Sequence, residues 1–81
     1  MQEPTIGRIV IYHTTEEERE LMRATSYVNV QSELPAVIVS VWSGECVNAK
    51  VLIDGGIGDL WKTSISMGDN EGQWSWPEIK S

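Results

Sequence analysis

The sequence has almost none of the residues that cross-link small domains. Cys46 is the only cysteine and His13 the only histidine among the 81 residues. An intrachain disulfide is therefore excluded, and no structural zinc is expected, because such sites combine several cysteine and histidine ligands. We expect no cofactor. One free cysteine is typical of a reducing cytoplasm. Because the core of so short a chain is marginal, self-association is the remaining source of stability, and we expect a homo-oligomer. A monomer with a modest core is the alternative.

Positive charge is also scarce. Six lysines and arginines stand against twelve aspartates and glutamates, which gives a net charge of −6. Non-specific DNA or RNA binding depends on clustered cations that release counterions from the phosphates, and the cations of this chain form no run. We therefore expect no nucleic-acid polymer as partner. A small nucleotide remains open, because one or two cations can hold a phosphate.

Long hydrophobic runs are missing as well. The longest, such as residues 36–39, are far shorter than the roughly 20 residues that a membrane-spanning helix needs. Residues 1–4 have neither the basic start nor the apolar segment of a secretion signal. We therefore expect one soluble domain over residues 1–81, without a membrane partner.

The chain contains instead a series of short β-strand patterns. Each is rich in β-branched residues or alternates apolar and polar positions, and turn signals lie between them. The expected strands cover residues 6–12, 36–42, 46–53, 60–67 and 73–76. Because side chains alternate along a strand, we expect Trp61, Thr63, Ile65 and Met67 to share one face.

One helix is expected after the first strand, over residues 13–24. Thr14 with Glu17, or Thr15 with Glu18, has the spacing of a capping box, in which two side chains satisfy free backbone N–H groups. So short a helix is stable only when it packs on the rest of the domain.

Residues 25–34 are predicted to be a polar connection with a short extended piece at 27–30, closed by Pro35. Together the patterns predict a mostly β fold with one short helix inserted after the first strand. It is either a small SH3-like, partly closed barrel or a strongly twisted antiparallel sheet.

Four tryptophans beside no phenylalanine are the most unusual feature. Trp74 and Trp76 are two residues apart on a strand, so they share a face, and Trp61 on a neighbouring strand can join them. Such rings stack nucleobases, with about 1–3 kcal/mol per base. Small β domains also use tryptophan as core filler, so both roles stay open.

Polar residues near these tryptophans suit the rest of a nucleotide. Lys62 and the hydroxyls after it can contact a phosphate or ribose, although such residues are also normal on an exposed strand. Arg8 can bind a phosphate in bidentate fashion or pair with one of the many acids. The predicted ligand-binding residues are Arg8, Tyr12, Asn48, Trp61, Lys62, Thr63, Ser64, Trp74 and Trp76.

Motifs for catalysis are absent from the sequence. The glycine-rich loop 54–59 lacks the Gly-Lys-Ser/Thr of a P-loop, and no helix follows it as in a dinucleotide-binding turn. No spacing ties His13 to Cys46, and the glutamates of 16–20 match a solvated helix face. We predict no catalytic residue and no enzyme.

Two segments resemble the opening and closing motifs of a family of small proteins encoded by tailed bacteriophages. They are PTIGRIVIY at residues 4–12 and GQWSWPE at 72–78. The segments 34–39, 47–51 and 61–64 also resemble the strands of this family. The sequence departs from the family pattern at Ile11 and Ser75, where histidines are common, so a role that needs those imidazoles is not carried over.

The resemblance implies a phage origin and a location in the host cytoplasm. Many small, oligomeric phage proteins of this kind act as sponges. They bind cyclic oligonucleotides or cyclic ADP-ribose signals of bacterial defence systems such as CBASS and Thoeris, without cleaving them. In this reading the tryptophans hold bases, Arg8 and Lys62 hold phosphates, and Asn48, Thr63 and Ser64 contact sugar or base edges.

Other functions stay open. The main alternative is a protein–protein interaction module that inhibits a host factor or serves in the virion, because tryptophan is enriched at interface hot spots. A small nucleotide hydrolase and a purely structural protein are further alternatives.

Overall fold

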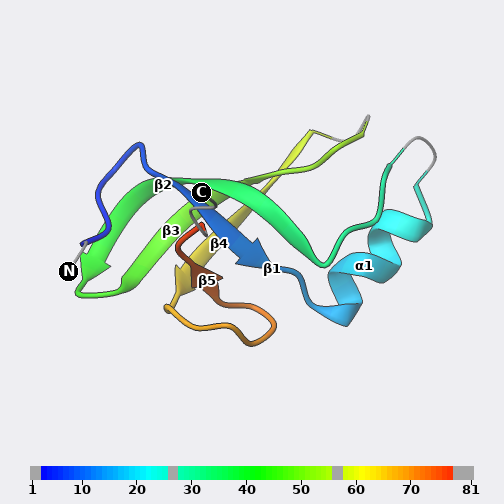
Figure 1. Ribbon diagram of the computed structural model, residues 1–81. Coiled ribbons are helices and arrows are strands. Elements are labelled where there is room, and N and C mark those ends of the chain that lie inside the picture. The colour runs from blue at the N-terminus through cyan, green and yellow to red at the C-terminus, as the bar shows by residue number, and fades with distance from the viewer. Residues whose placement is uncertain (1–2, 26–27, 56–57, 78–81) are drawn as a thin grey trace, which may run out of the picture.

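A curved antiparallel sheet and one short helix make up the fold in the computed structural model of the protein (Figure 1). The structure describes residues 3–25, 28–55 and 58–77. The elements in chain order are β1 (Ile9–His13), α1 (Glu16–Arg23), β2 (Glu33–Ser43), β3 (Cys46–Leu52), β4 (Asp59–Ile65) and β5 (Trp74–Ser75). The predicted mostly β fold, with one helix after the first strand, is confirmed.

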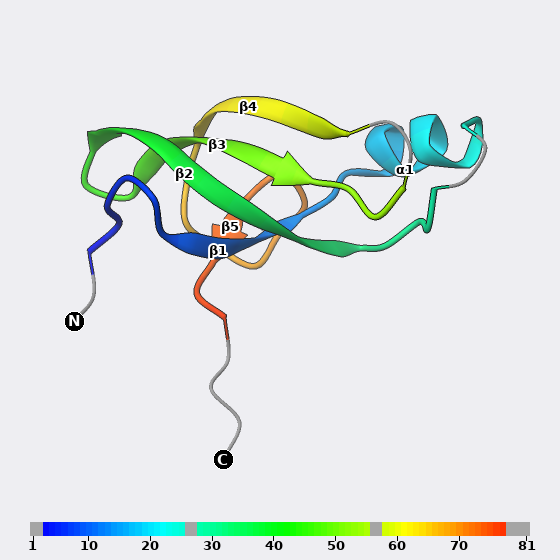
Figure 2. The same cartoon turned by 90° about the horizontal axis from the view of Figure 1, so that it is seen from above.

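The five strands form one sheet in the order β4-β3-β2-β1-β5. The sheet is not closed, because β4 and β5 are its two edges. The chain just after β4 nevertheless reaches β5: Gly68 N donates to Trp74 O at 2.8 Å, and Trp74 N donates to Ser66 O at 3.1 Å. Seen from above, β2 runs diagonally between β3 and β4 on one side and β1 and β5 on the other (Figure 2). The result is a twisted, open sheet in which an isolated bridge between Met67 and Trp74 links the segment after β4 to β5.

One face of the sheet forms the hydrophobic core. Alternate residues of β1, β2 and β3 point inward, as the two-residue period of a strand requires. The buried apolar residues are Val10, Tyr12, Met22, Leu34, Ala36, Ile38, Val47, Ala49, Val51, Ile53, Ile65 and Trp74. The opposite face, called here the outer face, carries the exposed side chains of Ile9, Val39, Leu52 and Trp61.

The first strand begins later than the sequence pattern predicted. Gly7 has φ +94°, a left-handed conformation that favours glycine, and Arg8 N donates to Thr5 O at 3.2 Å. This turn delays the strand to Ile9.

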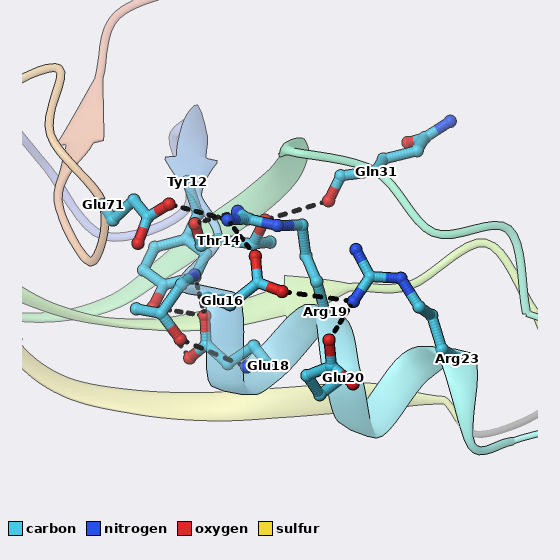
Figure 3. Close-up of polar contacts among 10 residues, drawn as sticks. Tyr12, Thr14, Glu16, Glu18, Arg19, Glu20, Arg23, Gln31 and Glu71 are labelled. Carbon is cyan, nitrogen blue, oxygen red and sulfur yellow. Dashed lines mark hydrogen bonds and ion pairs between the residues drawn. The ribbon is translucent and has the colours of Figure 1, made fainter.

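Helix α1 uses the second of the two predicted capping boxes. Glu18 N donates to Thr15 Oγ1 at 3.2 Å, and Thr15 N donates to Glu18 Oε1 at 2.8 Å. Thr14 is buried instead and donates to Gln31 O at 2.9 Å (Figure 3). The helix therefore starts at Glu16, not at residue 13.

Pro35 was predicted to close a loop before the second strand, and this prediction is wrong. Pro35 lies inside β2, opposite Ile11 of β1. Pairing of β2 with β3 begins only at Ala36, so Pro35 is at the end of the sheet where one side of β2 is unpaired. A proline is tolerated there, because no partner needs its missing N–H.

Strand β4 contains a bulge that the alternation pattern did not reveal. Ala49 pairs with Lys62 and Val47 with Ile65, so two β4 residues lie opposite the single residue Asn48. Ser64, in the bulge, has φ +56°. An extra residue in a strand moves the side chains that follow it to the opposite face of the sheet. Trp61 therefore points to the outer face, whereas Ile65 points into the core. The prediction that these two share a face is wrong.

The remaining boundaries differ by one or two residues, as is common at strand ends. In the extended piece predicted at 27–30, Val28 forms an isolated bridge with Gly55, and Tyr27 lies outside the described residues. Gly56 and Ile57 of the glycine-rich loop and Glu78 of the closing motif also lie outside them. No helix in the described part of the chain is long and apolar enough to cross a bilayer.

Candidate functional site

A cavity of about 420 Å³ opens beside the paired strands β1 and β5. This volume lies in the range of about 300–1,000 Å³ typical of small-molecule sites. The cavity is lined by Ile11, His13, Glu33, Asp69, Ser75, Trp76 and Pro77. Strand pairing brings several of these residues together, because Ile11 lies opposite Ser75 of β5 and His13 lies opposite Glu33 of β2.

His13 is the polar centre of this cavity. Its Nε2 is 2.8 Å from Ser75 Oγ and 3.8 Å from Asp69 Oδ1, while its Nδ1 is 3.6 Å from Glu33 Oε2. The His13 side chain is only 12% exposed, whereas the two carboxylates are 65% and 91% exposed. The imidazole is therefore fixed between a hydroxyl and two solvated carboxylates.

A second cavity of about 240 Å³ adjoins the first and shares His13, Glu33 and Asp69 with it. Its cation, Arg19, is already engaged: it donates to Glu71 at 2.6 Å and to Glu16 at 3.0 Å (Figure 3). These hydrogen bonds raise the pKa of Arg19. The smaller cavity thus presents no unpaired positive charge to an anion.

Arg8 and Trp76, two predicted ligand residues, are brought together. The Arg8 guanidinium carbon lies 5.1 Å from the centroid of the Trp76 ring, a cation–π distance. Trp76 in turn meets Trp74 edge to face, with the ring centroids 5.2 Å apart, and it lines the larger cavity. Trp76 therefore contacts the Arg8 guanidinium and also forms part of the cavity wall.

Arg8 differs from the other described cations in its partners. Arg19, Arg23, Lys50 and Lys62 all form ion pairs with carboxylates. In the described ranges Arg8 has no carboxylate within ion-pair distance. Among the described residues, Arg8 contacts the aromatic face of Trp76.

Tyr12 and Trp74, two other predicted ligand residues, lie in the core without exposed surface. The Tyr12 hydroxyl donates to the Glu18 carboxylate at 2.8 and 2.9 Å, and burial together with this carboxylate raises the pKa of Tyr12. Trp74 Nε1 donates to Glu45 O at 2.8 Å. The polar groups of both side chains are used within the chain.

Lys62 is also engaged inside the molecule. Its Nζ lies 2.7 Å from Glu18 Oε2, and Glu18 is buried. Burial alone raises the pKa of Glu18, but Lys62, the Thr15 N–H and the Tyr12 hydroxyl together lower it below its ordinary value. This cluster attaches α1 to the sheet.

Asn48, Thr63 and Ser64 meet at the β4 bulge. The buried Asn48 Oδ1 accepts from Thr63 Oγ1 at 3.0 Å, from Ser64 N at 2.9 Å and from Trp42 Nε1 at 2.8 Å. The Trp42 ring is thereby held in place although it is 63% exposed. Trp61 lies on the outer face, whereas Trp74 is in the core, so the predicted grouping of three tryptophans is wrong.

The sequence did not single out His13 and Ser75 as ligand residues. Their proximity depends on the pairing of β1 with β5, which joins residues more than 60 positions apart. Ile11 and Ser75 lie opposite one another in this pairing, and both line the cavity.

Comparisons with known proteins give no information on the function. No family model matches the chain, and neither a curated protein nor a solved structure matches it. Within residues 3–25, 28–55 and 58–77, no group of three or more His, Cys, Asp or Glu side chains is placed to hold a metal ion.

Proposed function

We propose that this protein binds and sequesters a small nucleotide signal, of cyclic oligonucleotide or cyclic ADP-ribose type, without cleaving it. The observation that carries the proposal is the contact of Arg8 with Trp76 beside the cavity. Arg8 is the phosphate ligand, and the base lies against the Trp76–Arg8 pair.

The chemistry of these two residues supports this role. Nucleobases stack on aromatic rings and on arginine planes, and a guanidinium fits two phosphate oxygens at once. Ser75 Oγ and the His13 imidazole add hydrogen-bonding groups for a sugar or a base edge. A sponge needs only such contacts, because capture of the signal is its whole effect.

The biological setting of the proposal comes from the sequence resemblance. The motifs at residues 4–12 and 72–78 support a phage origin, and hence action in the host cytoplasm against a defence signal. The exposed apolar side chains of the outer face support the proposed homo-oligomer, because an assembly would cover them.

The test is titration calorimetry with a panel of cyclic dinucleotides, cyclic trinucleotides and cyclic ADP-ribose isomers. We expect at least one to bind, and Arg8→Gln to weaken its binding about tenfold or more, as expected for loss of a charge-assisted hydrogen bond. Arg23→Gln is the matched control, because Arg23 is exposed and pairs with Glu16 and Glu20 on α1.

Two results would overturn the proposal. One is a panel in which no nucleotide binds. The other is an Arg8→Gln variant that binds as tightly as the wild type.

A second candidate function, a protein-interaction module, is favoured by Trp42. This side chain is highly exposed and yet fixed by the buried Asn48, and rigid exposed tryptophans are typical interface anchors. Pull-down from host lysate with wild type and Trp42→Ala tests it. A partner whose capture is unaffected by the substitution counts against this reading.

A further inference from the structure

Strand β4 is one edge of the sheet, and the hydrogen bonds of the sheet define which of its backbone groups face that edge. In an antiparallel pair, residues that bond to the partner strand alternate with residues whose N–H and C=O point away from it. Ile53 N donates to Gly58 O at 3.2 Å, and these two residues continue the register of β3 with β4. The alternation then directs the backbone groups of Leu60 to β3, and those of Asp59 and Trp61 to the free edge.

The other side of the sheet gives the same assignment. Ile38 N donates to Arg8 O at 3.0 Å, so Ile38 of β2 bonds to β1. Its neighbour Val37 therefore faces β3, where it lies opposite Lys50. Lys50 in turn bonds to β2, so Trp61, which lies opposite Lys50 in β4, directs its N–H and C=O away from the sheet. Within residues 3–25, 28–55 and 58–77, no strand pairs with that side of β4.

This edge lacks the features that protect the edges of sheets. Such edges are commonly blunted by proline, bulges, free charges or a covering element. Strand β4 has seven residues without a proline, Asp59–Ile65, and its bulge lies near the far end, at Ser64. Its charged residues, Asp59 and Lys62, are both paired within the chain. The strand runs along one margin of the sheet (Figure 2), whereas the other edge strand, β5, has only two residues.

A second copy of β4 fits this edge in one two-fold register. Directly opposite side chains share a face of the sheet, so one residue must lie opposite its own copy on the two-fold axis. An axis at Asp59 or at Lys62 places like charges opposite one another, which is destabilising. An axis at Leu60 leaves Lys62 without a partner in the strand, and an axis beyond Lys62 places the bulge at Ser64 inside the pairing. An axis at Trp61 avoids all of these conflicts.

We propose that two copies of the chain pair through β4, antiparallel and centred on Trp61, so that one sheet continues across both. The two Trp61 residues then exchange both backbone N–H···O=C hydrogen bonds. Asp59 lies opposite Thr63 of the second copy, and Leu60 lies opposite the apolar stem of Lys62. The two indole rings, each 56% exposed in the single chain, lie side by side on the outer face. The inference rests on the homo-oligomer of the proposed function and names its interface.

Disulfide cross-linking in a Cys46→Ser background tests the register. The Cα atoms of a hydrogen-bonded antiparallel pair are about 5.5 Å apart, within the roughly 4.4–6.8 Å that a disulfide spans. Under a mild oxidant, Trp61→Cys should therefore cross-link to its own copy. Asp59→Cys mixed with Thr63→Cys should form the mixed dimer, in a pairing that retains both Trp61 rings. Val39→Cys is the control, because Val39 is exposed on the outer face of β2 and away from β4, and it should stay reduced.

Amide hydrogen exchange tests the same pairing in the unmodified protein. The Lys62 N–H faces β3 and is protected in a single chain, whereas the Trp61 N–H faces the free edge and is protected only when a second copy pairs with it. We expect both amides to exchange about a hundredfold or more slowly than an unpaired amide. Fast exchange of the Trp61 amide beside slow exchange of the Lys62 amide would overturn the proposal.

The remaining outcomes separate this interface from the rest of the proposed function. A wild-type protein that stays at the mass of one chain overturns the pairing. Cross-linking through Val39→Cys, with none at positions 59, 61 and 63, overturns the β4 interface and leaves a homo-oligomer through another part of the outer face. None of these measurements involves a nucleotide, so nucleotide capture stands or fails by its own titration.

Discussion

At the scale of single residues, the four tryptophans have different surroundings. Trp74 has no exposed surface, Trp76 is half-buried beside the cavity, and Trp42 and Trp61 are 63% and 56% exposed. A sequence pattern cannot separate these cases, because a tryptophan on a strand looks the same whether its face is covered or not. Only Trp76 therefore retains a combination of partial exposure, a neighbouring cation and a cavity.

Trp74→Phe should destabilise the protein, whereas Trp42→Phe should do so much less. The first substitution removes part of a fully buried ring and leaves Glu45 O without its donor, which costs about 1–3 kcal/mol. The second acts at a largely exposed ring and should cost less than about 1 kcal/mol. Urea denaturation followed by far-ultraviolet circular dichroism measures both. Equal losses would contradict the assignment of Trp74 to the core.

At the scale of elements, helix α1 depends on a polar cluster for its attachment. Glu18 accepts hydrogen bonds from the Thr15 N–H and the Tyr12 hydroxyl (Figure 3) and pairs with Lys62 of β4. The helix buries only Glu18 and Met22 among its own residues. The carboxylate is therefore as important to docking as the single apolar anchor.

The protein should lose stability in acid through Glu18. Its folded-state pKa is below the ordinary value, so the unfolded chain takes up the proton first as the pH falls. This stabilisation is complete above about pH 5 and is lost as the pH falls through the folded pKa. Glu18→Gln removes it, so the decline in unfolding free energy below about pH 5 should become shallower. Urea melts at several pH values test this, and Glu17→Gln should keep the wild-type profile.

At the scale of elements, the β4 bulge is stabilised by hydrogen bonds to the Asn48 side chain. Asn48→Ala removes the acceptor shared by Trp42 Nε1, Thr63 Oγ1 and Ser64 N. We expect a loss of about 1–3 kcal/mol and greater mobility of the Trp42 indole. Urea melts and the ¹⁵N relaxation of that indole N–H measure the two effects. Asn70→Ala, at an exposed turn position, should change neither.

Much of the fold could be predicted from the sequence, because local patterns determine it. The period of two in residues 46–53 and the spacing of Thr15 and Glu18 correctly located β3 and α1. The incorrect predictions, for Pro35 and for the faces of residues 61–65, concern features that depend on the pairing of strands distant in sequence. The position of Pro35 at an unpaired edge depends on where β3 ends, and the reversal at Ser64 depends on register with β3.

The candidate site was harder to predict from the sequence, because it too depends on the pairing of distant strands. Arg8 and Trp76 were selected for their chemistry, and the structure places them in contact. His13 was overlooked, because its partners Ser75, Glu33 and Asp69 come from three other segments of the chain. Their proximity follows from strand order, which no local pattern encodes.

At the scale of the whole molecule, the outer face leaves apolar side chains uncovered. Strand pairing places Ile9, Val37, Lys50 and Trp61 in one row across four strands. Lys50 is the only charge in that row, and its Nζ lies 3.9 Å from Asp59. Such a surface suits an interface between copies of the chain.

Light scattering should therefore give a multiple of the 9.1 kDa chain mass. Trp61→Glu introduces an unpaired charge into the apolar row and should shift the protein towards the monomer. Leu21→Glu, at an exposed position of α1, should not. A wild-type protein that remains at the mass of one chain at about 100 µM would contradict the homo-oligomer.

The central claim is that the protein captures an intact nucleotide through Arg8 and Trp76. Native mass spectrometry of the wild type and Arg8→Gln, each mixed with the same panel of cyclic nucleotides, tests it most directly. We expect the wild type to retain one nucleotide of unchanged mass at a fixed stoichiometry, and Arg8→Gln to lose most of it. A wild type that stays bare across the panel, or a retained nucleotide of hydrolysed mass, would contradict the account.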